Sequence, residues 1–196
     1  IRDERHLTYR LYGLKYLQYL CLCFIFVFLS IASVEAAALS NSDYKIAKSA
    51  FLDAKKKKWK KASQKAVKAK NALPAKLVRW MQITDPKKDV SFQEIATFIS
   101  HNSDWPRQSV LQRRAEEAMN ETIPADSILK WFAGRQPVSA NGHIMLTAAL
   151  EQLGRTEELK LQVKKSWLKV NFGRDQQKQF YRRYKKYLSY SDHVER

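Results

Sequence analysis

Apolar positions between residues 39 and 196 recur at intervals of three and four, the spacing that lines one face of an α-helix. The clearest series are Tyr44, Ala47, Ala50, Phe51 and Ala54, and Leu146, Ala149, Leu150 and Leu153. No stretch alternates apolar and polar residues over the length of a strand with enrichment in β-branched side chains. The pattern therefore predicts an all-α domain.

Helix-breaking residues divide this pattern into segments. The five prolines fall between the segments, and Gly134, Gly154 and Gly173 follow apolar runs, where a left-handed helix C-cap favours glycine. Ser91 and Glu94 have the spacing of a capping box, and the sequence Asp104-Trp105-Pro106 predicts a helix start with proline in the first turn. Together these signals predict nine helices with short connections. Their ranges are 42–56, 58–71, 74–83, 91–101, 105–120, 124–133, 138–153, 155–170 and 174–188.

Two parts of the chain look alike. The segment 50–54 is followed by a short turn, Trp59 and an alanine-rich helix, and the segment 149–155 is followed by a helix that reaches Trp167. Tryptophans recur at positions 59, 80, 105, 131 and 167, as in degenerate helix-hairpin repeats. Such hairpins stack into an α-solenoid, since one hairpin alone cannot bury its apolar stripe. An ordinary helical bundle with scattered tryptophans is the alternative.

Residues 1–38 have the composition of a secretory signal peptide. Four basic residues come first: Arg2, Arg5, Arg10 and Lys15. An apolar run over residues 19–29 and a small-residue segment ending in Ala36-Ala37-Ala38 follow, as expected before a cleavage site. Extending the run to Val34 admits polar residues, so an uncleaved inner-membrane anchor is the alternative. Either way we expect residues 39–196 to be exported to the periplasm.

Both cysteines, Cys21 and Cys23, lie in the predicted leader. Cleavage after Ala36 or Ala38 leaves no cysteine, which excludes disulfides, thiolate nucleophiles and cysteine zinc sites from the mature chain. The exported domain must therefore be stabilised by its core. At 196 residues and 45% hydrophobic content, the chain is long and apolar enough for one domain with such a core.

The formal net charge of +17 draws acidic partners to the surface. Residues 1–38 carry four basic and three acidic side chains, so residues 39–196 keep 32 basic and 16 acidic ones, a net +16. The densest segment is Lys55–Lys61 around Trp59. It resembles a nucleic-acid patch, but export argues against nucleic acid. Trp59, Ala62, Ala66 and Ala69 form one apolar stripe, so the lysines form either a solvated helix face or a surface for an anionic polymer or membrane.

A second basic cluster covers residues 182–187 and interleaves aromatic side chains with charges. Phe180, Tyr184, Tyr187 and Leu188 share helical spacing, which favours core residues. Aromatic platforms that stack on sugars or bases are the alternative.

The sequence identifies no catalytic, cofactor-binding or metal-binding residue. His6 lies in the leader, and His101, His143 and His193 have no ligand-type partner at metal-binding spacing. The chain has no nucleophile elbow and no phosphate-binding loop. Its acidic pairs, Glu116-Glu117 and Glu157-Glu158, are adjacent in sequence and diverge on a helix, so they do not form a two-carboxylate site.

Several short motifs follow one another in a recognisable order along residues 44–196. They are Ala50-Phe51-Leu52-Asp53-Ala54 with Trp59; residues 74–80; Ser100-His101-Asn102-Ser103-Asp104-Trp105-Pro106; residues 111–116; Leu129-Lys130-Trp131-Phe132; residues 137–142; Trp167; Asn171-Phe172; and residues 191–196. This order resembles the N-terminal superhelical region of soluble lytic murein transglycosylases, especially the alphaproteobacterial type.

The resemblance implies a solenoid that curves into a ring-like surface and holds a peptidoglycan glycan strand. Enzymes of this family cleave the strand between N-acetylmuramic acid and N-acetylglucosamine without water. Their acid–base glutamate lies in a C-terminal lysozyme-like domain, in a Glu-Ser pair. This sequence contains no Glu-Ser dipeptide. We therefore expect a chain that is truncated before the catalytic domain and inert by itself.

Two functions remain after the sequence analysis. The first is a non-catalytic scaffold or glycan-holding segment of such an enzyme, with peptidoglycan strands as partner, an anionic membrane surface as a second partner, and no nucleic acid. The alternative is an exported, basic helical-repeat module that binds a protein or an anionic envelope polymer. No cofactor is expected, and the sequence leaves the oligomeric state open.

Overall fold

The structure, a computed structural model, describes residues 39–196, and all regular elements within this range are helices. Ser42–Arg196 form one compact unit. The elements are α2 Asn41–Lys55, α3 Trp59–Ala66, α4 Leu73–Thr84, α5 Phe92–His101, α6 Gln108–Glu117, α7 Ala125–Phe132, α8 Ala140–Gln152, α9 Thr156–Lys169, α10 Arg174–Tyr184, the 3-10 turn η1 Lys185–Tyr187 and α11 Tyr190–Val194. The predicted all-α class is confirmed. Each predicted segment overlaps an observed helix, and α11 was not predicted. The predicted leader, with Cys21, Cys23 and His6, lies outside the described residues.

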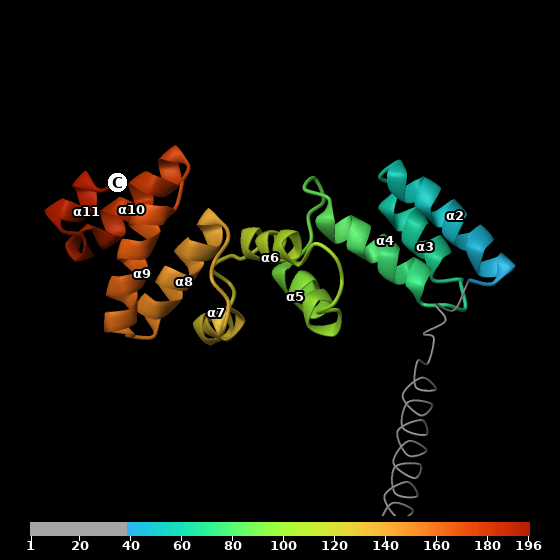
Figure 1. The fold of residues 1–196 in the computed structure, drawn as a ribbon, viewed down its shortest axis with the longest axis horizontal. Helices are drawn as coiled ribbons and strands as arrows, with labels where there is room; N and C mark the ends of the chain where they lie inside the picture. Colours follow the sequence, from blue (N-terminus) through green and yellow to red (C-terminus); the bar gives the residue numbers. More distant parts are fainter. Residues whose placement is uncertain (1–38) are drawn as a thin grey trace, which may run out of the picture. The chain divides into compact units, whose positions relative to one another are not determined.

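Several pairs of consecutive helices lie against one another in space. Figure 1 shows α3 beside α4, α5 beside α6, and α8 between α7 and α9. The other extensive contacts join α4 with α6, α6 with α8 and α9 with η1, which are two elements apart. Further contacts join α9 with α11, three elements apart, and α10 with the adjoining η1. Within the described residues, packing is thus dominated by elements close in sequence.

Helix α3 is shorter than predicted, and an acidic side chain of α2 binds the backbone that follows it. The Asp43 carboxylate accepts hydrogen bonds from the backbone N–H groups of Lys70 (2.9 Å) and Asn71 (3.2 Å). The Asn71 side chain in turn accepts from the Leu73 N–H, which starts α4. The apolar stripe predicted for this segment is confirmed at Ala62 and Ala66, which are buried.

The predicted start of the helix near Trp105 is wrong. Helix α6 begins at Gln108, after Arg107, whose φ of 65° places it in the left-handed region. The Gln108 side chain donates to the carbonyls of Asn102 and Trp105, and the Pro106 carbonyl accepts from Trp80 Nε1. These contacts hold residues 102–107 as a folded turn between α5 and α6.

The prediction for Gly173 is also wrong, whereas those for Gly134 and Gly154 are confirmed. Gly134 and Gly154 have φ values of 78° and 67°, the left-handed conformation expected after a helix. Gly173 has a φ of −62° and lies at the start of α10. Helix α9 ends earlier because Val170 is extended, which brings Phe172 into the core.

The turns after α2 and α8 have the same hydrogen bonds. After α8, the Gly154 and Arg155 N–H groups donate to the carbonyls of Glu151 and Leu150. After α2, Lys57 and Lys58 donate in the same register to Ala54 and Asp53, and Lys57 has a φ of 58°. Both turns are therefore Schellman C-caps followed by a helix. This shared geometry lies in the two regions whose sequences look alike, with a lysine at the position that normally favours glycine.

The core consists of three clusters of buried apolar side chains arranged along the chain. Alanines dominate the first, between α2, α3 and α4: Ala50, Ala54, Ala62 and Ala66 with Val78. The second, from α4 to α8, contains larger side chains such as Ile95, Leu111 and Trp131. The third, from α8 to η1, includes Val163, Trp167, Phe172, Phe180 and Tyr184. All five tryptophans pack in or against these clusters.

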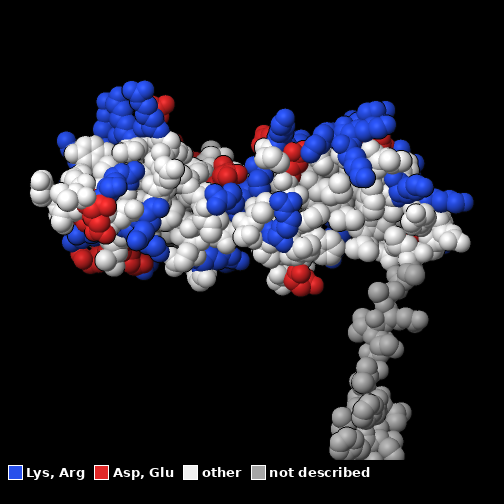
Figure 2. Space-filling view, turned by 45° about the horizontal axis from the view of Figure 1, so that its top comes forward, with Lys and Arg blue, Asp and Glu red and all other residues white. Residues whose placement is uncertain are grey.

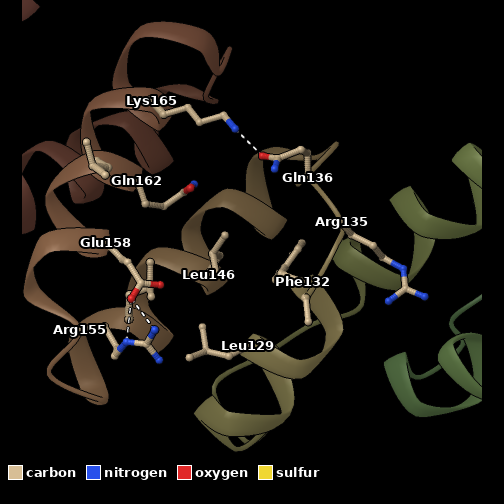
Figure 3. A pocket seen from close by; sticks show the side chains of 12 residues that line it. Leu129, Phe132, Arg135, Gln136, Leu146, Arg155, Glu158, Gln162 and Lys165 are labelled. Atoms are coloured by element: carbon tan, nitrogen blue, oxygen red, sulfur yellow. Dashed lines mark hydrogen bonds and ion pairs between the residues drawn. The ribbon is translucent and has the colours of Figure 1, made fainter.

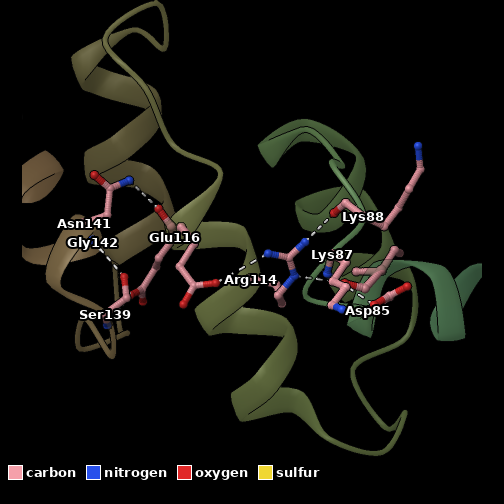
Figure 4. A network of polar contacts seen from close by, with 10 residues as sticks. Asp85, Lys87, Lys88, Arg114, Glu116, Ser139, Asn141 and Gly142 are labelled. Carbon is pink, nitrogen blue, oxygen red and sulfur yellow. Dashed lines mark hydrogen bonds and ion pairs between the residues drawn. The ribbon is translucent and has the colours of Figure 1, made fainter.

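Helix α6 links its neighbours on both sides through polar contacts (Figure 4). On one side, Arg114 donates to the carbonyls of Ile83 (3.3 Å) and Lys88 (2.6 Å), at the end of α4 and in the loop after it. On the other side, the fully buried Glu116 carboxylate accepts from the N–H groups of Val138 and Ser139, before α8. These side chains complete backbone groups that helix ends leave unpaired.

Candidate functional site

The acidic pairs singled out in the sequence are each engaged in structural contacts. Glu116 is buried against the start of α8, while Glu117 forms an ion pair with Arg114 at 3.5 Å. Glu157 and Glu158 are exposed and pair with Lys160 (2.7 Å) and Arg155 (2.5 Å). Neither pair brings two carboxylates together over a common space.

The histidines lie apart from one another, and no cluster of potential metal ligands occurs within residues 39–196. His101 is exposed at the end of α5, with Nδ1 2.8 Å from the Thr97 carbonyl. His193 packs edge-on against Trp167 and Tyr181 at ring-centroid distances of 5.5 and 5.6 Å. His143 is buried in α8.

The second basic cluster has the predicted arrangement. Phe180 and Tyr184 are 3% and 2% exposed and face the third core cluster, while Tyr187 and Leu188 pack against it. Burial raises the pKa of the Tyr184 hydroxyl, which lies 3.3 Å from Glu151. The basic residues Arg182, Arg183, Lys185 and Lys186 are exposed. The aromatic side chains at 180, 184 and 187 are thus core residues.

An open groove of about 420 Å³ lies between α7, α8 and α9. Its apolar lining includes Leu129, Phe132, Leu146, Leu150 and Leu161. Figure 3 shows the polar side chains Gln136, Gln162 and Lys165 on one side of this apolar floor and the Arg155–Glu158 ion pair on another. Lys165 bonds to Gln136 and so links α9 to the segment before α8. The volume lies in the range of small-ligand pockets, roughly 300–1,000 Å³.

A buried polar network supports one wall of this groove. The Gln162 side-chain amide donates to His143 Nδ1 (3.1 Å) and to Ser166 Oγ (3.0 Å), and Ser166 Oγ lies 3.1 Å from His143 Nδ1. Burial lowers the pKa of His143 to about 4, the Lys165 charge acts in the same direction, and a hydrogen bond to the Pro137 carbonyl opposes both. His143 is therefore neutral at pH 7. Ser166 is fully buried and is not accessible as a nucleophile.

The network fixes the orientation of the Gln162 side chain. With its amide nitrogen held by His143 and Ser166, the side-chain carbonyl oxygen has no hydrogen-bond donor among the described residues, while Gln162 lines the groove. The groove thus offers an oriented acceptor, a cationic side chain and an apolar floor.

Comparisons with protein-family models, with curated proteins and with solved structures give no match. The interpretation of the groove therefore depends on its own chemistry.

A second hollow, of about 430 Å³, lies next to α11. It is lined by Trp167, Tyr181 and His193 on the aromatic side and by Arg174, Gln177 and Lys178 on the polar side. Trp167 is only 5% exposed and donates its Nε1 hydrogen to the Asp192 carbonyl.

The groove could not be predicted from the sequence. Its lining comes from three helices and the loop before α8, and no local motif marks it. One signal was present: Gln162 and Ser166 are polar residues spaced four apart on the core face of α9, between Leu159, Val163 and Trp167. Polar residues in a core stripe usually satisfy one another or a partner.

The helices of the described part of the chain include none with the length and apolar character needed to cross a bilayer.

Proposed function

We propose that residues 39–196 form a non-catalytic scaffold that holds peptidoglycan glycan strands in the periplasm, as in the superhelical region of lytic murein transglycosylases. The observation that carries this proposal is the groove between α7, α8 and α9. A glycan strand has apolar sugar faces and many hydroxyl groups, and peptidoglycan also carries carboxylates. The Leu129 and Phe132 floor suits the faces, the Gln162 oxygen suits a hydroxyl, and Lys165 suits a carboxylate.

The solenoid is part of the same proposal. Packing between elements close in sequence, three successive core clusters, and the equivalent turns at Lys57 and Gly154 support stacked helix hairpins. Export by residues 1–38 is a further element of the proposal, supported by their sequence.

Binding to purified peptidoglycan sacculi tests the proposal, with co-sedimentation as the measurement. Lys165→Gln removes a positive charge inside the groove, and Lys164→Gln removes the same charge from the neighbouring residue outside it. We expect sacculi to bind the wild type and Lys164→Gln alike, and to bind Lys165→Gln several-fold more weakly. The chain should release no anhydro-sugar from the sacculi.

Other outcomes overturn the proposal in distinguishable ways. An absence of binding to sacculi refutes the glycan-holding role and favours the exported interaction module. Equal losses for Lys164→Gln and Lys165→Gln show binding through net charge rather than through the groove. Such binding weakens steeply with salt because exposed charges are screened over about 8 Å at physiological ionic strength.

A further inference from the structure

Helices α2 and α3 and the turns beside them carry a dense positive surface. Its exposed members, called here the α2–α3 lysine surface, are Lys45, Lys48, Lys55, Lys56, Lys57, Lys58, Lys60, Lys61, Lys68 and Lys70. Figure 2 shows Lys and Arg side chains gathered over the part of the molecule that contains these helices. This surface lies on elements other than those that form the groove.

Local acidic groups neutralise little of this charge. Residues 39–71 contain two acidic side chains, Asp43 and Asp53. Asp43 is buried and binds the backbone after α3, while Asp53 forms its ion pair with the half-buried Lys65 at 2.7 Å. Of the ten lysines of the surface, Lys57 alone has an acidic partner among the described residues, Asp85 at 2.9 Å. The remaining charges face solvent.

All cations of this surface are lysines, and residues 39–78 contain no arginine. Arginine recognises a carboxylate or phosphate with a fixed, two-pronged geometry, whereas a lysine ammonium is a compact charge on a flexible stem. A surface made of lysine alone fits attraction to many mobile anions better than recognition of one fixed anionic group.

Exposed apolar side chains are interspersed with the lysines. Tyr44 and Leu52 on α2 are 57% and 53% exposed, and Val67 after α3 is 67% exposed. Tyr44, Lys48 and Leu52 are spaced four apart and follow one line along α2, and Lys56 comes four residues later, directly after the helix. A purely solvated face gains nothing from exposed apolar groups. A bilayer interface takes them up between headgroups while lysine stems extend to the phosphates.

We propose that the α2–α3 lysine surface binds an anionic lipid bilayer, with lysines at the lipid phosphates and with Tyr44, Leu52 and Val67 between the headgroups. Its position in the chain agrees with this role. The apolar run of the leader ends at residue 29, and the chain from there to Asn41 spans at most about 40 Å. A leader that stays in the membrane therefore keeps α2 near the lipid surface.

Hydrogen–deuterium exchange of the full chain on vesicles tests the proposal. Vesicles of phosphatidylcholine alone are compared with vesicles that also contain phosphatidylglycerol. The leader is present in both samples, and the variants described next separate its own attraction to anionic lipid from that of the surface. We expect amides of residues 45–70 to exchange about fivefold more slowly, or slower still, on the anionic vesicles, and this slowing to disappear at high salt.

Matched variants separate the surface from net charge. The quadruple variant Lys55→Gln, Lys56→Gln, Lys60→Gln and Lys61→Gln removes four charges from the surface. The control variant Lys169→Gln, Arg182→Gln, Lys185→Gln and Lys186→Gln removes four exposed charges from α9, α10 and η1. We expect the slowing to be lost in the first variant and kept in the second. Far-UV circular dichroism of both variants confirms that the helices are intact.

Leu52→Ser keeps every charge and tests the apolar contribution. It should reduce the slowing on anionic vesicles and leave binding to soluble polyglutamate unchanged. Equal exchange of residues 45–70 on the two kinds of vesicle overturns the proposal, as do equal effects of the two quadruple variants. Slowing by polyglutamate as strong as that by anionic vesicles, with no effect of Leu52→Ser, assigns the surface to an acidic polymer instead.

Discussion

At the scale of single residues, Lys57 has a backbone conformation that is unfavourable for a residue with a Cβ. Its φ of 58° matches that of Gly154 in the equivalent turn, and the left-handed conformation costs a non-glycine residue roughly 1–2 kcal/mol. The Lys57 ammonium group forms an ion pair with Asp85 and lies 5.4 Å from the Trp59 ring centroid. At this turn, charge is combined with an unfavourable backbone conformation.

The left-handed backbone at Lys57 predicts that glycine and alanine variants have opposite orders of stability at positions 57 and 48. Lys57→Gly and Lys57→Ala both remove the Asp85 contact, so their difference isolates the backbone, and we expect the glycine variant to be more stable by about 1 kcal/mol. At Lys48, inside α2, the order reverses and alanine is more stable by about 1 kcal/mol. Gly154→Ala should cost a similar amount. Urea unfolding measures all five variants, and an alanine advantage at position 57 contradicts the left-handed turn.

Gly142 and Glu116 should be strongly coupled. A Cβ added at Gly142 would lie 2.7 Å from Glu116 Cδ, so an alanine must displace the buried carboxylate from the start of α8. We expect Gly142→Ala to destabilise the fold by about 1–3 kcal/mol. In a Glu116→Ala background the same substitution should cost at least about 1 kcal/mol less, because the clash is absent. A double-mutant cycle by urea unfolding gives this difference, and additive costs would refute the coupling.

His143 predicts a pH dependence of stability. Its folded pKa of about 4 lies below the unfolded value of 6.5, so between these values the unfolded chain binds a proton that the folded one does not. Stability from this group is fully present above about pH 6.5 and decreases toward pH 4, by at most about 1.4 kcal/mol per pH unit. His143→Asn should flatten the urea midpoint over this range. An unchanged slope in the variant would show that His143 does not titrate as the fold requires.

At the scale of elements, the three clusters differ in what they bury. Four of the five buried residues of the first cluster are alanines, whereas the second cluster buries isoleucine, leucine, phenylalanine and tryptophan. Because stabilisation scales with the apolar area removed from water, α2 and α3 are held less strongly. Local opening of α2 and α3 is therefore an equilibrium that a ligand on the α2–α3 lysine surface can shift toward the closed state.

Native-state hydrogen exchange should resolve this difference. We expect the amides of α2 and α3 to exchange through local opening, at a free energy below that of global unfolding, while α5 and α6 exchange near the global value. Small amounts of urea should leave the α2 and α3 rates nearly unchanged and accelerate the others. Protection of α2 and α3 equal to that of α5 would refute the weaker attachment.

At the scale of the whole molecule, Ser42–Arg196 contain all the residues of the three clusters. We therefore expect purified residues 39–196 to fold without residues 1–38. The far-UV circular dichroism spectrum should be strongly helical, and the helical signal should be lost on addition of urea. A sheet-dominated spectrum would contradict the fold.

The sequence by itself determined the helical class, the helix segments and several of their ends. These features depend on local signals: the apolar period, the Ser91–Glu94 capping box, which is present as predicted, and the left-handed glycines at 134 and 154. The predictions failed where a distant group decides the local backbone. The Asp43 carboxylate on α2 binds the backbone beyond the end of α3, and Trp80 on α4 binds the Pro106 carbonyl in the turn before α6.

The tertiary structure alone decided where the candidate site lies. The groove requires Phe132, Leu146 and Lys165 to meet from three helices, and the oriented Gln162 requires His143 from another helix. It also decided that Glu116 is a structural carboxylate and that, among the described residues, Asp85 is the one acidic partner of the α2–α3 lysine surface. Periodicity along a chain specifies which face of a helix is buried. It does not specify which other face that helix meets, because that depends on packing between distant residues.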